Sequence, residues 1–430
     1  MTRGDEVSRT LAADSSVADE ALRPTAAPPW LPARPVPAQE PWELAVRAPE
    51  RIVTLPLSAL AYVAKNTTRV TEQRQLIDRF AGSAAGAGRP RLGLSVGAPH
   101  LGPAVGLGLA VDFKPSLLQS AFSAHLAGST KKYTRTLLAL HRGPAMLHYE
   151  YDWRPRDRFF GYGLGSANDS SSSFAWRQQR FQLTLIYPWQ QTHAKPRLAQ
   201  VQGWIGPREI VIRHGRLAPS FEQTFPGQAG LLNLRQERLV YGLQLVRDSR
   251  VGEPHWLHGV RTELRAERFD KAIDALTLRS AHTEAPQFTR LSFRGQTGFS
   301  FMRDPRTFRV AVRAVSTGPV AGSAPLLIPD LVSLGADDGL ASLALGRFRD
   351  RDLLYGAASY IFPLSRQLEM ELHSETGGVY ARMRDAKPSS FKQSYGFSLR
   401  PRTDLRVLGA VGADWSPGAF VIRYSLGGEQ

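Results

Sequence analysis

The sequence predicts an all-β fold, a 16-stranded antiparallel transmembrane β-barrel with an N-terminal arm and a short amphipathic helix. Three observations carry this prediction: apolar and polar residues alternate with period two, many alternating runs exceed nine residues, and short turns alternate with long loops. Strict alternation indicates strands with two unlike faces. A tilted membrane strand needs about 9–11 residues, whereas strands in soluble sandwiches and small barrels usually have about five or six.

The first 88 residues differ from the rest of the chain. Residues 1–45 are rich in proline and alanine and cannot bury a core, so we expect an extended or disordered arm. Residues 46–88 combine an apolar half with a charged half and end in a Gly, Ala and Ser linker, which predicts an amphipathic helical segment broken near Pro56. This segment either covers one end of a core or lies in a membrane interface, and the pattern leaves both possibilities open.

Residues 89–430 form the predicted barrel, with about 16 strands, an even number as in bacterial outer-membrane barrels. The apolar positions recur at every second residue in 147–153, 181–189, 239–245, 291–299, 308–314, 395–399 and 420–426. The opposite face is polar, charged or very small, as at Arg290, Ser292 and Arg294. No stretch reaches the roughly 18 consecutive apolar residues of a membrane helix, which excludes a helical membrane protein.

The connections between these strands follow the same pattern. Short turns such as Arg142-Gly143-Pro144 contrast with long loops near 155–173, 215–234, 268–285, 318–350 and 377–390. Short turns on one side and long loops on the other are typical of an outer-membrane barrel. Aromatic residues near strand ends are expected to form girdles at the membrane interfaces, or to pack in the core or in turns: Trp153, Phe159, Phe160, Tyr187, Trp189, Trp256 and Trp415.

Composition narrows the function classes. The 430 residues include no cysteine, which excludes a disulfide scaffold, a thiolate zinc site, an iron–sulfur cluster and a cysteine nucleophile. The formal net charge is +16, and 46 of the 54 basic residues are arginine, which indicates anionic partners. A nucleic-acid site is not expected, because no basic helix or aromatic platform accompanies the charge.

Two segments resemble the bacterial surface-antigen family, the superfamily of outer-membrane β-barrels that includes the BamA assembly factor. Residues 158–170, beginning Arg158-Phe159-Phe160-Gly161, are similar to a loop motif of that family, and residues 346–352 with the following 360–364 resemble its long sixth loop and next strand. The resemblance covers about 90–428. It implies a 16-stranded barrel in the bacterial outer membrane with the sixth loop folded into the lumen, although residues 1–19 contain no apolar segment of a secretory signal.

The sequence departs from the family at the tip of that loop. The family carries an arginine there, which reaches acidic groups on the barrel wall, but the aligned residues are Leu340-Ala341-Ser342-Leu343. Where the family usually has a glutamate on the barrel wall, this sequence has Ser359. A third family motif also carries an acidic residue, and here that residue is Glu375. Together with the neighbouring Arg347, Arg349 and Asp350, these residues predict a degenerate loop-six lock. A buried guanidinium needs acidic partners, so losing either side destabilises such a lock.

These features predict a non-enzymatic barrel without cofactor or metal. The family's substrate-receiving POTRA domains have about 75 residues each and are not expected here, because about 45 of the roughly 88 residues before the first strand are rich in proline and alanine. We therefore expect an accessory or scaffold component of outer-membrane protein or envelope assembly, and a passive anion-preferring pore is the alternative. The arm is the expected contact for an envelope assembly or periplasmic protein partner.

The arginines give two further expectations. Those in or beside long loops, including Arg158, Arg347 and Arg349, are expected to bind lipopolysaccharide phosphates at the outer-membrane lipid surface. Those on strands are expected to line a lumen that favours anions: Arg290, Arg294, Arg309 and Arg313.

Overall fold

The structure is a computed structural model that describes residues 91–96, 106–113, 120–129, 132–166, 171–191, 198–215, 219–253, 256–271, 285–301, 306–365, 368–401 and 409–426. The chain divides into two units, Met1–Leu57 and Ser58–Gln430, and every described residue belongs to the second. The predicted arm (1–45) and helical segment (46–88) lie outside the described residues.

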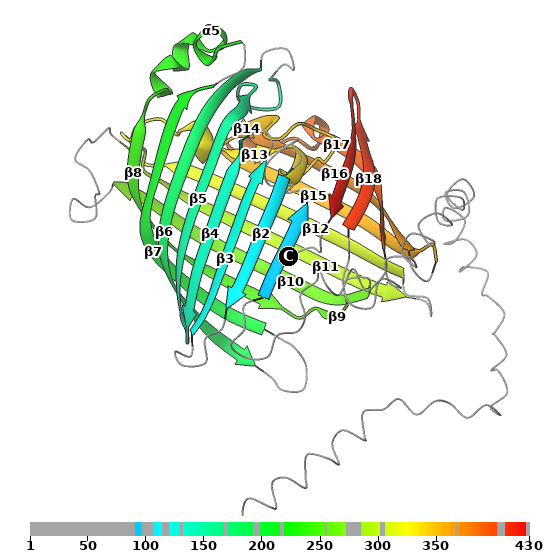
Figure 1. Ribbon diagram of the computed structural model, residues 1–430. Helices are drawn as coiled ribbons and strands as arrows, with labels where there is room; N and C mark the ends of the chain where they lie inside the picture. Colours follow the sequence, from blue (N-terminus) through cyan, green and yellow to red (C-terminus); the bar gives the residue numbers. More distant parts are fainter. Residues whose placement is uncertain are drawn as a thin grey trace, which may run out of the picture. The chain divides into compact units, whose positions relative to one another are not determined.

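The described chain is built almost entirely from β-strands, as Figure 1 shows. The first eight are β1 (Arg91–Val96), β2 (Gly106–Phe113), β3 (Ser120–Ser129), β4 (Thr134–Arg142), β5 (Ala145–Phe159), β6 (Ser172–Gln191), β7 (Leu198–His214) and β8 (Arg235–Asp248). The others are β9 (Val251–Glu253), β10 (Trp256–Lys271), β11 (Phe288–Phe301), β12 (Arg306–Pro319), β13 (Val332–Leu334), β14 (Phe348–Asp350), β15 (Asp352–Pro363), β16 (Leu368–Tyr380), β17 (Lys392–Pro401), β18 (Gly409–Ser416) and β19 (Ala419–Leu426).

The described strands form one large sheet of 17, and β13 pairs separately with β14. Neighbours in the large sheet are successive in the chain and antiparallel, except that β8 pairs with β10 across the short β9, and β12 pairs with β15 across β13 and β14. The first strand meets the last at one residue pair, Val96 and Leu426. The predicted all-β, antiparallel class is confirmed.

The two faces of the sheet differ as the alternation predicts. One face carries large apolar side chains that are exposed, including Tyr187 at 70%, Phe420 at 66% and Ile422 at 67%. We call this the outer face. The opposite, inner face carries most of the arginines and carboxylates, such as Arg208 and Glu267, and many of these are partly or fully buried. A folded chain exposes so many large apolar residues only when lipid or another apolar partner covers them.

The aromatic residues divide between the two expectations, girdle and core. Tyr187 and Trp415 are exposed, as girdle residues should be, and the side chains of Trp189 and Trp256 lie outside the described set. Phe159 and Phe160, however, are 0% and 5% exposed. The bulge between Arg154 and Asp157 in the pairing of β5 with β6 breaks the alternation just before them, so both rings pack beneath the loops instead.

The longest connections leave the same end of the sheet, here called the long-loop end. They span 160–171, 215–234, 272–287, 320–351 and 381–391. The described parts of these connections contain short helices: α5 (Phe221–Thr224), η2 (Pro226–Leu231), η4 (Ile328–Asp330), η5 (Ala336–Asp338), η6 (Met383–Asp385) and η7 (Pro388–Ser390). The capping box at Ser220 and Gln223 fixes the start of α5. Among the described residues, no helix has the length and apolar character to cross a membrane.

Candidate functional site

Loop six, residues 320–351 between β12 and β15, is the most extensively buried connection in the described chain. Its β13 and β14 lie against β15 and β16 of the sheet (Figure 1). Leu326, Leu327 and Ile328 join one buried apolar cluster with wall residues of β5 to β8, β10 and β11, and Leu334, Leu340 and Phe348 join a second with β12, β15 and β16. The apolar residues of this loop therefore account for its folding back onto the inner face.

Asp330 ties loop six to the wall by charge. Its carboxylate lies 2.8 Å from Arg238 Nη1 and 3.2 Å from Arg208 Nη1, and its main-chain oxygen accepts a hydrogen bond from Arg290 Nη2. These arginines come from β8, β7 and β11. The side chains of Asp330 and Arg238 are only 0% and 1% exposed, so each charge depends on the other for the solvation that water no longer provides.

Two stacked phenylalanines complete this anchor. The rings of Phe269 and Phe288 lie 4.1 Å apart, and the guanidiniums of Arg208, Arg238 and Arg290 lie 5.4–5.6 Å from one or both rings. Cation–π contacts hold the guanidiniums in place around the carboxylate. Burial raises the pKa of Asp330, but Arg238 and Arg208 outweigh that effect and hold its pKa below the ordinary range, so the carboxylate is ionised.

A second anchor joins the C-terminal part of loop six to β5 and the loop after it. Arg349 Nη2 lies 3.2 Å from Asp157 Oδ2, which also accepts a hydrogen bond of 2.7 Å from Trp176 Nε1. Arg347 donates to the side-chain and main-chain oxygens of Ser166 at 2.8 and 2.6 Å, and its guanidinium lies 4.9 Å from the centre of the Phe160 ring. Burial lowers the pKa of Arg347.

The loop tip, Leu340-Ala341-Ser342-Leu343, forms a third anchor through its backbone. The Ala341 amide donates to Glu375 Oε2 at 2.6 Å, and the other oxygen of Glu375 accepts from the Tyr355 hydroxyl at 2.7 Å. The Ser342 amide donates to Ser394 Oγ at 3.2 Å. A main-chain N–H of the tip therefore binds the Glu375 carboxylate of the wall. The resembled family has an arginine side chain in this role. A carboxylate that binds a backbone amide makes a charge-assisted hydrogen bond, which is stronger than a neutral one.

Replacing Glu375 with alanine is expected to free the tip of loop six. The change leaves the Ala341 amide and the Tyr355 hydroxyl without their acceptor, at a cost of about 1–3 kcal/mol. We expect cleavage of loop six by a soluble protease to become about tenfold faster, since cleavage follows local opening. Glu375→Gln keeps one acceptor oxygen and should fall between the two, whereas wild-type cleavage rates in Glu375→Ala would contradict the assignment.

The other loop-six and family-motif residues named from the sequence lie in the following positions. Asp350 is buried in β14, and burial raises its pKa. Ser359 lies on β15 between Arg309 and His373 in register, four residues from Tyr355. Arg158 is exposed, and Gly161 adopts a positive φ of 99° at the turn after β5. Phe159 packs against Phe221 and Phe225, with ring centres 5.9 and 5.0 Å away.

The four strand arginines all belong to β11 and β12, but the structure divides them. Arg290 belongs to the Asp330 anchor. Arg294 and Arg313 are direct partners across β11 and β12, and both line one cavity of the inner face. Arg309 lies further along β12, opposite Gly298. Arg290 lines the same cavity as Arg294 and Arg313, so three of the four arginines share it.

Four residues of the first two anchors are not among the sequence-predicted site residues: Asp330, Arg208, Arg238 and Asp157. One signal was available, because Asp330 is the single charge in the apolar run from Leu326 to Val332. An ionised residue in such a run needs a buried partner. Its partner Arg208 is 122 residues away in the chain, and no local pattern indicates that pairing.

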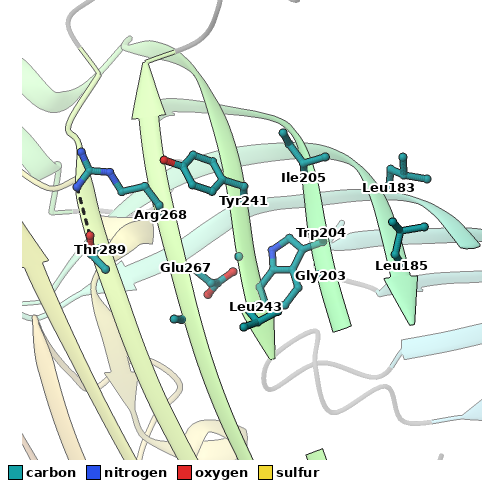
Figure 2. Close-up of a pocket in the computed structure, with 12 residues that line it drawn as sticks. Leu183, Leu185, Gly203, Trp204, Ile205, Tyr241, Leu243, Glu267, Arg268 and Thr289 are labelled. Atoms are coloured by element: carbon teal, nitrogen blue, oxygen red, sulfur yellow. Dashed lines mark hydrogen bonds between the residues drawn. The ribbon is translucent and has the colours of Figure 1, made fainter. Parts of the chain in front are cut away.

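The described residues offer no metal-binding group of three or more His, Asp or Glu side chains. A groove of about 620 Å³ lies on the outer face among the exposed side chains of Leu183, Leu185 and Ile205 (Figure 2). It forms where Gly203 and Gly242 contribute no side chain to the wall. The groove is therefore a feature of the apolar outer face, separate from loop six.

Comparisons with known proteins agree with this architecture. No protein-family model and no curated protein matches the sequence. The structure is similar to BamA from Haemophilus ducreyi lacking POTRA domains 1–3, with a TM-score of 0.54 and 10% identity over 79% of this chain and 69% of that one. It is also similar to CdiB from Escherichia coli, with a TM-score of 0.50 and 11% identity over 77% of this chain and 61% of that one. The chain therefore shares its fold with these two solved structures.

Proposed function

We propose that this chain is a non-enzymatic barrel of the bacterial outer membrane that serves as an accessory or scaffold component of outer-membrane protein or envelope assembly. One observation carries the proposal: loop six is fixed to the inner face at three places, by Asp330, by Arg347 and Arg349, and by its tip. The tip has no arginine and is held by its backbone, so the family lock is present only in a degenerate form. A loop fixed in this way favours a rigid barrel over an opening one.

We also propose that the barrel is closed and has 16 strands. Leaving out the short β9 and the separate β13–β14 pair, the strands β1–β8, β10–β12 and β15–β19 make 16, an even number. The seam between β1 and β19 rests on one pair in the described residues, Val96 and Leu426. Closure of a sheet removes both of its unpaired edges, which lipid could not solvate.

A disulfide should form across this seam. Directly opposed Cα atoms in antiparallel strands lie about 4.5–5.5 Å apart, within the disulfide range. The chain has no cysteine of its own, so Val96→Cys with Leu426→Cys introduces one possible pair. We expect oxidation to cross-link most of the folded protein, measured by non-reducing electrophoresis after cleavage between the two positions. Val96→Cys with Ala410→Cys, which places the second thiol on β18, is the matched control, and equal cross-linking in both pairs would contradict a defined seam.

The proposed partners are outer-membrane lipid, lipopolysaccharide, and an envelope assembly or periplasmic protein bound through residues 1–45. Lipopolysaccharide is supported by Arg158 and Arg213, which are exposed near the long-loop ends of β5 and β7. Arg213 shares a face with the exposed Ile205, so it lies above the apolar band on the outer face. Arginine there can pair with lipid phosphates.

An anion-preferring pore is the second candidate, and the arginine-rich inner face favours it. Two measurements on the purified protein separate the candidates. If the chain is a scaffold, we expect little steady conductance in planar bilayers. We also expect envelope proteins to co-purify with the full chain and to be lost when residues 1–45 are removed. Mass spectrometry of the same preparation should detect bound lipopolysaccharide. Steady anion-selective conductance without co-purifying proteins would overturn the scaffold role in favour of the pore.

A further inference from the structure

A cavity of about 310 Å³ lies on the inner face beside loop six. Strands β6, β7, β8, β10, β11 and β12 line it, together with Val332 of loop six. Its volume is near the lower end of the range for small-molecule sites, roughly 300–1,000 Å³. It lies on the opposite face of the sheet from the apolar outer face, so a ligand would enter it from the inner face.

The cavity is strongly positive. Six arginines line it, against two carboxylates, Glu263 and Glu267. The arginines are Arg180, Arg208, Arg265, Arg290, Arg294 and Arg313. Glu267 pairs with Arg265 at 2.5 Å and lies 3.6 Å from Arg180, while Glu263 pairs with Arg261 at 2.5 Å. Arg208 and Arg290 are already engaged by Asp330.

The remaining two arginines face each other. Arg294 and Arg313 are direct partners across β11 and β12, and like charges in this position destabilise a sheet. Arg313 reaches only the Asp338 carbonyl, at 3.5 Å, and Arg294 forms no ion pair with any carboxylate of the described residues. Glu263, the residue opposite Arg294 on β10, is directed to Arg261 and Gln244. A bound anion would relieve the repulsion between the two guanidiniums.

We propose that this cavity binds a small soluble phosphate-class oxyanion between Arg294 and Arg313. Guanidinium groups match the planar, two-oxygen face of phosphate, and two of them on adjacent strands can bind one multivalent anion from both sides. Arg180, whose Nη2 is buried without a hydrogen-bond partner among the described residues, adds positive potential to the same cavity. The inference goes beyond the scaffold role and does not depend on it, because a resident anion site requires neither an assembly partner nor conduction.

Inorganic pyrophosphate is the probe, titrated calorimetrically into the purified full chain in a zwitterionic detergent. We expect saturable binding with one site per chain, weakened about tenfold by Arg294→Gln or by Arg313→Gln, because each removes a charge-assisted contact. Arg294→Lys keeps the charge without the planar fork and should bind with intermediate affinity. Arg384→Gln, at an exposed arginine of the loop after β16, is the matched control and should bind as the wild type does.

Several outcomes would overturn the proposal. Absence of saturable binding, or equal affinity in Arg294→Gln, Arg313→Gln and the wild type, would do so. A folded variant is recognised by its unshifted mobility in electrophoresis without heating, so loss of binding through unfolding is detected separately. Micelles containing phosphatidylglycerol should not displace pyrophosphate, and displacement would assign the site to lipid phosphate in place of a soluble anion. Anion conductance with unsaturable binding would favour the pore instead.

Discussion

Asp330→Asn is expected to destabilise the folded protein by about 3–5 kcal/mol, the usual cost of removing one member of a buried ionic group. The substitution keeps the shape of the side chain but leaves Arg208 and Arg238 buried without a counter-charge. Both are held among the rings of Phe269 and Phe288, so they cannot reach water without disrupting the packed cluster around them. Unfolding in urea from lipid vesicles, followed by tryptophan fluorescence, measures the change.

The same variant should alter the acid dependence of stability. Because the pKa of Asp330 is held below its ordinary value of 3.8, its contribution to stability is complete above that value and is lost as pH falls through the native pKa. The wild type and Asp330→Asn should therefore differ most at neutral pH and converge in strong acid. Asp385→Asn is the control, since Asp385 is exposed and lies 4.0 Å from Arg384. A stability difference between Asp330→Asn and the wild type no larger than that of Asp385→Asn would contradict the anchor.

Arg349→Ala is expected to destabilise the protein by about 3 kcal/mol and to release the C-terminal part of loop six. Asp157 would lose the cation at 3.2 Å and retain the Trp176 indole and the Arg158 amide as hydrogen-bond donors in this buried place. A double-mutant cycle with Asp157→Asn isolates the pair, because the coupling energy excludes losses that each substitution causes alone. Urea unfolding of the four proteins gives this coupling energy.

The matched control for Arg349→Ala is Arg384→Ala, an arginine 73% exposed on the loop after β16. Exposed ion pairs contribute little, so this change should leave stability within about 0.5 kcal/mol of the wild type. Coupling near zero between Arg349 and Asp157 would show that loop six is held by its apolar clusters and its other anchors, and not by this pair.

The scaffold proposal depends on how firmly loop six is fixed, and the two substitutions above test that directly. Asp330 and Arg349 lie near opposite ends of the loop, and the tip contact to Glu375 lies between them. Three contacts with different strands restrict the loop more than one contact at the tip, because opening must break several buried groups together. A loop that is held by several separate anchors is suited to a fixed structural role.

Sequence reasoning succeeded where the information is local. The alternation around Leu183 and Leu291 placed those side chains on one face, and both are exposed on the outer face. It left two possibilities open at Phe159 and Phe160, because a bulge in β5 interrupts the period of two, and only the structure shows that both rings are buried. It identified the loop tip and Glu375 as neighbours through a family resemblance, but not that a backbone amide makes the contact.

By itself, the sequence determined that this chain forms long, two-faced antiparallel strands with long connections at one end, because side-chain alternation and turn spacing are written residue by residue. Only the tertiary structure decided which charges meet. Asp330 contacts Arg208, Arg238 and Arg290 because the antiparallel sheet brings β7, β8 and β11 close to the same residue of loop six. Electrostatic pairing depends on distance in space and on exclusion of water, and neither quantity is encoded in spacing along the chain.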